Sequence, residues 1–191
     1  MRTEDTTLKD LMNPGAAEDF FARRKMDPFD VTSDPRNFSL PNALWLMELS
    51  RLVYRREDPE PKPHPSKRSK FLVTQNLEEL KFFSEPGNTA DTQAMLVRST
   101  SAPKWAALVF RGTEQKPADV ISDLLLSVPL LGLGDVHRGF KHALDIVWDE
   151  IEKKLTDPAL EDAPLFMTGH SLGAALATLA AARHKPRAVY T

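Results

Sequence analysis

The chain has 191 residues, a formal net charge of −2 at pH 7 and no cysteine. This length predicts one domain with a substantial hydrophobic core. The small net charge gives no reason to expect nucleic acid as a partner. The lack of cysteine excludes disulfide bonds and thiolate metal sites, and no other metal-binding motif is visible.

The N-terminal segment is polar. It lacks the apolar stretch of a secretory signal peptide, and the longest apolar stretch, residues 124–133, is too short to span a bilayer. We therefore expect a cytoplasmic protein. Residues 1–38 contain three prolines and no sustained period, so they predict an N-terminal arm draped over a domain at 39–191. The short basic clusters at residues 23–25 and 67–70 are interpreted as solvated surface.

A helix is predicted from Ser39 to about Arg56. Ser39 has the character of an N-cap, Pro41 falls in the first turn, and apolar residues then recur at helical spacing. Trp45 and Tyr54 are interpreted as packing residues rather than a platform for substrate. The four prolines between Pro59 and Pro65 cannot continue this helix and predict a stiff, extended surface loop.

Three short β-rich segments follow at residues 80–84, 92–98 and 104–110, separated by turn residues, and they predict a meander. Residues 138–155 form a clear amphipathic helix pattern. A strand at 164–168, a helix at 172–184 and a last strand starting near Arg187 complete an alternation that predicts parallel βαβ units. Because helix 172–184 is apolar or small almost all round, we expect it to be buried on most sides.

Residues 169–173 read Gly-His-Ser-Leu-Gly between that strand and that helix. This is the pattern of a nucleophile elbow, in which Ser171 projects an exposed hydroxyl from a tight strand-to-helix turn. The free N–H groups and the positive dipole end of the helix then face the serine, and the N–H of Leu172 is expected to be one oxyanion donor. The alternative is a serine that only caps the helix, which explains neither flanking glycine.

Three motifs in this order resemble the class 3 lipases: Val-Phe-Arg-Gly-Thr-Glu at 109–114, Asp-Val-His-Arg-Gly-Phe at 135–140 and the elbow itself. The resemblance covers residues 40 to 191 and is firm from Lys104 onward. It implies an α/β-hydrolase fold with a mixed sheet, here C-terminally incomplete. It further implies a serine ester hydrolase acting on acylglycerols or phospholipids, with a mobile lid and transient contact with a membrane or lipid-droplet surface.

The same resemblance assigns the second oxyanion donor to Thr113, where an ordinary threonine at a strand end is the alternative. It places the lid at residues 114–120. Arg111, Asp123 and His137 fall on family motif positions and are interpreted as structural, with Arg111 and Asp123 able to pair. A serine mechanism of this kind needs no cofactor.

A catalytic base is missing from the predicted site. After Ser171 the chain contains no Asp or Glu, and its one later histidine, His184, lies about 20 Å along the helix. His170 adjoins the serine but is expected to point away and stabilise the turn. His137 and His142 remain open by distance, although they precede Ser171 and would break the order of the α/β-hydrolase triad.

We therefore expect the catalytic Asp and His to lie in a longer parent protein, and the 191 residues alone to be inactive. Two other hypotheses stay open at this point. One is a non-catalytic remnant or interaction module that keeps the hydrolase scaffold. The other is a different hydrolase with the Gly-X-Ser-X-Gly pattern, such as a peptidase or acyltransferase, against which the two upstream motifs argue.

Overall fold

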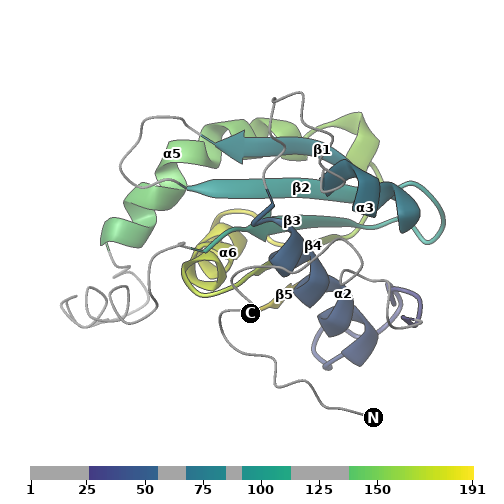
Figure 1. Cartoon of the computed structure of the whole chain (residues 1–191). Helices are drawn as coiled ribbons and strands as arrows, with labels where there is room; N and C mark the ends of the chain where they lie inside the picture. Colours follow the sequence, from purple (N-terminus) through teal and green to yellow (C-terminus); the bar gives the residue numbers. More distant parts are fainter. Residues whose placement is uncertain (1–25, 56–67, 85–91, 113–137) are drawn as a thin grey trace, which may run out of the picture.

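The computed structural model describes residues 26–55, 68–84, 92–112 and 138–191. Within these segments one five-stranded sheet has the order β1-β2-β3-β4-β5 (Figure 1). Its strands are β1 (Leu77–Ser84), β2 (Gln93–Ser99), β3 (Ala106–Phe110), β4 (Leu165–Gly169) and β5 (Ala188–Tyr190). The first three pair antiparallel, and β3, β4 and β5 are parallel. The predicted meander and the predicted parallel units are both confirmed.

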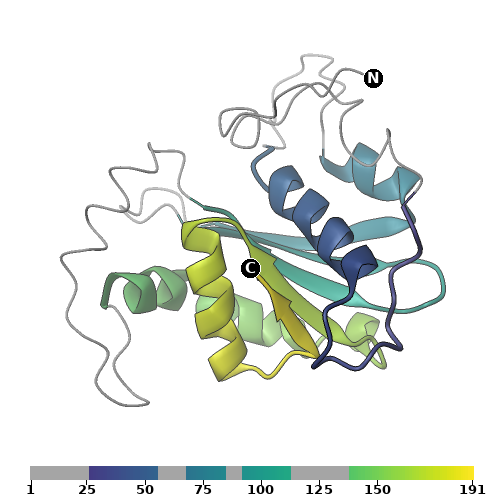
Figure 2. The ribbon, with the colours of Figure 1, turned by 90° about the horizontal axis from the view of Figure 1, so that it is seen from below.

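Helices cover both faces of the sheet, as Figure 2 shows. On one face lie α2 (Leu40–Leu52) and α3 (Arg68–Thr74), and on the other lie α5 (Arg138–Leu155) and α6 (Leu172–Arg183). All five residues of β3 are buried, and alternate side chains enter the two cores. Ala107 and Val109 face α2, whereas Leu108 and Phe110 face α5 and α6. This sandwich of a mixed sheet between helices is the α/β architecture that the sequence predicted.

Helix α2 starts where the sequence predicted, at Ser39. The Ser39 hydroxyl accepts a hydrogen bond from the Asn42 N–H, and Pro41 occupies the first turn. The side chain of Trp45 donates to the Asp27 carbonyl at 2.8 Å and packs edge-on against Trp105. Trp45 is therefore a packing residue, as expected.

Residues 26–38 contribute to the core. Phe29 is 4% exposed, stacks on Trp105 with ring centroids 3.9 Å apart, and meets Phe166 edge-on. The Arg187 side chain donates to the Ser33 carbonyl at 2.8 Å, which joins this segment to the chain entering β5. The described part of the expected arm is thus packed against the sheet.

The prediction that Arg68 lies on the solvated surface is wrong. The basic cluster at 67–70 was expected to be solvated, but Arg68 is only 2% exposed and lies in α3, which the sequence analysis did not predict. Its guanidinium binds both carboxylate oxygens of Glu79, bonds the Arg55 carbonyl, and lies over the ring of Phe82. Burial of this charge is offset by the paired carboxylate and the ring.

Helix α6 is less buried than predicted. It contacts β3, β4 and β5 on the sheet and α5 at its side, but Thr178, Ala182 and Arg183 are exposed. Small and apolar residues almost all round this helix therefore do not mean that it is enclosed on every side. Strand β5 is parallel to β4, as predicted.

Several predicted features lie outside the described residues. They are the proline-rich loop at 57–65, Thr113, the lid at 114–120, Asp123, the apolar stretch at 124–133 and His137. Among the helices that the structure does describe, none is long and apolar enough to cross a membrane.

Candidate active site

Ser171 occupies the turn between β4 and α6. Its φ of 57° and ψ of −123° lie in a region that residues with a Cβ rarely adopt, and its side chain is exposed. Such a conformation costs on the order of 1–3 kcal/mol and persists only where the surrounding structure imposes it. The predicted strand, tight turn and helix are therefore present, and they hold the serine hydroxyl at the surface.

The two glycines flanking Ser171 allow β4 and α6 to approach each other closely. A Cβ at Gly169 would collide with the Gly173 carbonyl and would lie 2.9 Å from the Phe110 carbonyl oxygen. A Cβ at Gly173 would in turn collide with the backbone of Phe110. Larger residues at either position would push α6 off the sheet, so the packing explains both glycines.

The structure does not support the alternative in which the Ser171 side chain caps the helix. Its side chain makes no capping hydrogen bond. The turn is closed instead by the backbone, with the Gly173 N–H donating to the His170 carbonyl and the Ala174 N–H to the Ser171 carbonyl, each at 3.0 Å. Among the described residues the Leu172 N–H has no acceptor. It lies beside the serine at the N-terminus of α6, where the first N–H groups of a helix have no partner within the helix.

The end of β3 lies against this turn. Phe110 is paired with Gly169, and the next residue, Arg111, donates its N–H to the Gln93 carbonyl at 2.9 Å. The Arg111 side chain is buried and bonds the Gln93 side chain at 2.6 Å, which supports its structural interpretation. Its expected partner Asp123 lies outside the described residues. The chain thus reaches Gly112, the residue before the predicted donor Thr113, directly beside the elbow.

Tyr54 joins these two segments. Its hydroxyl accepts a hydrogen bond from the Gly112 N–H at 3.1 Å and lies 3.3 Å from Nδ1 of His170. The Tyr54 side chain is 8% exposed and its ring meets the His170 ring edge-on. Tyr54 is therefore more than the packing residue that the sequence predicts. No pattern in the sequence signals its polar contacts, because Tyr54 lies 58 residues from Gly112 and 116 from His170.

None of the described histidines is placed to act as the base. His170 turns toward Tyr54, as expected of a residue that stabilises the turn. His184 caps the far end of α6, and His142 is exposed on α5. Within the described segments, no group of three His, Cys, Asp or Glu side chains could hold a metal ion.

The carboxylate of Asp145, on α5, is also bound by residues away from Ser171. Asp145 of α5 bonds Lys141 at 2.8 Å and pairs with Arg183 near the far end of α6. The hydrogen bond from Lys141, followed by that from Arg183, lowers the pKa of the Asp145 carboxyl below its ordinary value. This carboxylate is held ionised, away from Ser171.

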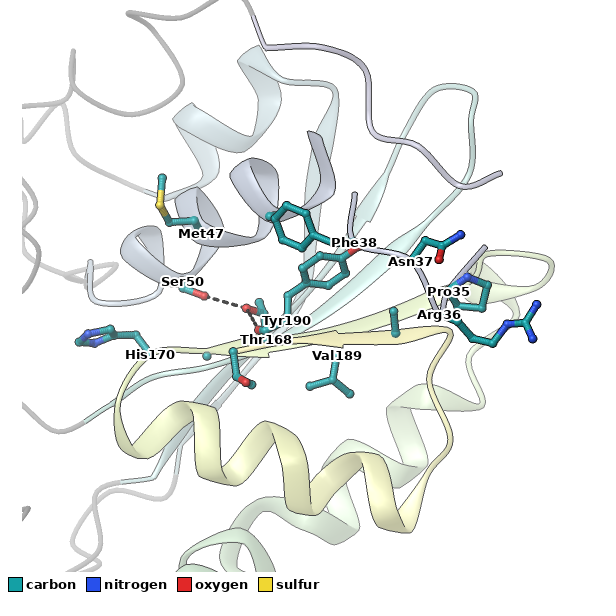
Figure 3. A pocket seen from close by; sticks show the side chains of 14 residues that line it. Pro35, Arg36, Asn37, Phe38, Met47, Ser50, Thr168, His170, Val189 and Tyr190 are labelled. Carbon is teal, nitrogen blue, oxygen red and sulfur yellow. Dashed lines mark hydrogen bonds between the residues drawn. The ribbon is translucent and has the colours of Figure 1, made fainter. Parts of the chain in front are cut away.

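A groove of about 620 Å³ opens beside β5, between residues 35–38, α2 and the ends of β4 and β5 (Figure 3). Phe38 and Tyr190 lie side by side in it, and Ser50, Thr168 and the Tyr190 carbonyl are linked by hydrogen bonds. Ser171 does not line this groove, which reaches the elbow at Gly169 and His170. The groove is therefore separate from the serine.

The mixed sheet between helices, with a strained serine between a parallel strand and a helix, defines the α/β-hydrolase class. Known proteins similar to the chain narrow this class to a family. Residues 107–189 match the family model of the lipases of class 3, so this part of the chain is similar to that family. The resemblance indicated by the three motifs is thereby confirmed. No curated protein matches the chain significantly.

Solved fungal lipases are similar to the chain. A deletion mutant of Rhizomucor miehei lipase in complex with its propeptide is 29% identical, with a TM-score of 0.50, over 62% of this chain and 41% of that lipase. Nonglycosylated Yarrowia lipolytica LIP2 lipase is 27% identical over 69% and 48%, with a TM-score of 0.49. The mono- and diacylglycerol lipase from Aspergillus oryzae is 27% identical over 67% and 48%, with a TM-score of 0.48. The chain thus spans less than half the length of these lipases.

Proposed function

We propose that this chain supplies the nucleophile of a serine ester hydrolase of the lipase type. The observation that carries the proposal is the conformation of Ser171, an exposed serine with φ of 57° at the N-terminus of α6, inside the segment that is similar to the class 3 lipases. Strain of this kind costs stability and is typical of functional sites. A serine with a structural task alone would have no need of it.

The proposed reaction is acyl transfer to Ser171. The Ser171 oxygen attacks the carbonyl carbon of an ester while a base takes the hydroxyl proton. The electrons of the carbonyl move onto its oxygen, which the Leu172 N–H and a donor at Thr113 stabilise. Collapse of this intermediate expels the alcohol, which takes the proton from the base, and water then releases the acid by the reverse sequence.

We propose that the Asp and His completing the triad lie in a longer parent protein. This rests on two facts: no Asp or Glu follows Ser171 in the sequence, and no described histidine reaches the serine. The chain also spans only 41% of the Rhizomucor miehei lipase. The 191 residues alone are then expected to bind an ester but to turn it over negligibly.

For the substrate we propose carboxylic esters of acylglycerols or phospholipids, presented at a membrane or lipid-droplet surface. The class 3 lipase match supports the carboxylic ester. The name of the Aspergillus oryzae protein describes action on mono- and diacylglycerols, which are substrates of this chemical kind. We also propose a cytoplasmic location and a lid at residues 114–120.

The experiment is hydrolysis of a p-nitrophenyl ester by the pure 191-residue chain and by Ser171→Ala. We expect both to be equally slow. Addition of imidazole as an external base should restore turnover by the wild-type chain but not by Ser171→Ala. Robust turnover without imidazole that is lost in Ser171→Ala would show that the chain holds its own base, which contradicts this account.

One observation favours a second candidate, a non-catalytic scaffold. No base is present around Ser171 among the described residues. A fluorophosphonate probe separates the two candidates, because it reacts with an activated serine only. Labelling of Ser171 in the presence of imidazole supports the hydrolase, and a folded chain that is never labelled supports the scaffold.

A further inference from the structure

Gly112 and the elbow are in contact, although about sixty residues separate them in the sequence. A Cβ placed on Gly112 would lie 2.5 Å from the His170 carbonyl oxygen and 3.4 Å from Cβ of Ser171, and it would collide with the Tyr54 hydroxyl. Only a glycine lets the backbone after β3 lie this close to the serine. The spacing between this backbone and Ser171 therefore depends on what holds Gly112 in place.

The sheet does not hold it. The pairing of β3 with β4 ends at Phe110 and Gly169, and Arg111 makes the last described backbone bond, to Gln93 of β2. The Gly112 N–H donates to the Tyr54 hydroxyl instead, and this bond is buried. The Tyr54 side chain thus accepts the hydrogen bond of the first residue beyond the paired part of the strand.

Tyr54 is itself well fixed. It follows the C-terminal end of α2, a helix that packs across β3 and β4 (Figure 2). Val53 and Tyr54 are buried in the core on this face, together with Leu49 and Leu52 of α2. The same hydroxyl lies 3.3 Å from Nδ1 of His170, the residue before the serine. One oxygen atom therefore contacts both segments that flank the site.

We propose that Tyr54 is a positioning residue for the reaction at Ser171. Its hydroxyl holds the end of β3 at Gly112 against His170, and thereby fixes the close spacing between this backbone and the nucleophile Ser171. The inference rests on the proposed function, since it concerns how the nucleophile of that same site is positioned. Displacement of a reacting group by about 1 Å costs roughly 100-fold in rate, so a single buried bond can matter here.

The first test does not depend on catalysis. Amide hydrogen exchange is measured by NMR in the 191-residue chain and in Tyr54→Phe, which keeps the ring. Tyr190→Phe is the matched control, because the hydroxyl of Tyr190 accepts a bond from the Ser39 N–H in the groove beside β5, away from Gly112. We expect the Gly112 amide to exchange about 5- to 10-fold faster in Tyr54→Phe only, the effect of losing one buried bond. The Leu108 amide in the middle of β3 reports that the fold is intact.

The second test measures the reaction. Labelling of Ser171 by a fluorophosphonate, with imidazole added as the base, is followed against probe concentration. In Tyr54→Phe we expect the maximal labelling rate to fall about 10-fold, with the half-saturating probe concentration unchanged, because transition-state stabilisation is lost and binding is not. Tyr190→Phe should label like the wild type.

The outcomes are distinguishable. Unchanged Gly112 exchange in Tyr54→Phe would show that the hydroxyl does not hold this backbone, and the proposal would fall. Faster exchange with an unchanged labelling rate would leave Tyr54 a structural residue and overturn its positioning role. A wild-type chain that is never labelled would overturn the proposed function, and the positioning role with it, whereas the exchange data would still show whether the contact exists.

Discussion

The strain at Ser171 predicts that replacing it with glycine stabilises the protein. The backbone at this position has φ of 57° and ψ of −123°, which glycine adopts readily and serine does not. Relief of the strain contributes about 1–3 kcal/mol. The greater freedom of glycine in the unfolded chain offsets roughly 0.4–1 kcal/mol of this. We therefore expect Ser171→Gly to raise the free energy of unfolding by about 0.5–2 kcal/mol.

Ser171→Ala is the control, because it removes the same hydroxyl and keeps the Cβ. The serine side chain is exposed and makes no capping bond, so Ser171→Ala should lie within about 0.5 kcal/mol of the wild type. Urea unfolding of all three proteins measures the differences, and the melting temperature of Ser171→Gly should rise by about 2–6 °C. If Ser171→Gly were less stable than Ser171→Ala, the backbone would not be strained and the elbow argument would be refuted.

Three further predictions concern the scaffold. Phe29→Ala removes a ring stacked in the core and should lower the free energy of unfolding by about 3–5 kcal/mol in urea, whereas no loss would exclude residues before Ser39 from the core. Arg68→Ala leaves the Glu79 carboxylate without its buried partner and should lower the free energy of unfolding by about 3 kcal/mol. Arg36→Ala breaks an exposed ion pair and should lower it by less than about 0.5 kcal/mol. Equal effects of the two substitutions would contradict the burial of Arg68. The bonds from Lys141 and Arg183 lower the pKa of Asp145, so this carboxylate stabilises the fold above its ordinary pKa of 3.8 and loses that effect as the pH falls through the lower folded value. Between pH 6 and pH 2 the free energy of unfolding should therefore fall more steeply in the wild type than in Asp145→Asn. The same pH dependence in both proteins would argue against the contacts of Asp145.

Strong local patterns made most of the fold predictable from the sequence. The amphipathic period fixed the helix at 138–155 with the bounds that the structure shows, and Ser39 with Pro41 fixed the start of α2. The start of β1 was placed three residues late, at Leu80 rather than Leu77. A register shift between Glu79 and Lys81 interrupts the alternation there. Helix α3 is only seven residues long, too short for a helical period to show.

The candidate site was predictable only where its residues are neighbours in the sequence. The elbow around Ser171 lies within five residues and was identified as a unit. Tyr54 was assigned to packing, because its contacts with Gly112 and His170 exist only once α2 has packed against the sheet. Arg68 was assigned to the surface, because a charge gives no sign in the sequence of the carboxylate that will pair with it. Contacts that form only in the folded chain decide both roles.

The central claim is that Ser171 is the nucleophile of a lipase-type hydrolase whose base lies outside the described residues. The most direct measurement is mass spectrometry of the 191-residue chain after treatment with a fluorophosphonate, with and without imidazole. The account predicts a single phosphonylated residue, Ser171, formed at a useful rate only when imidazole is present and absent from Ser171→Ala. Modification of other serines at the same rate, or none at Ser171 in a folded chain with imidazole, would contradict it.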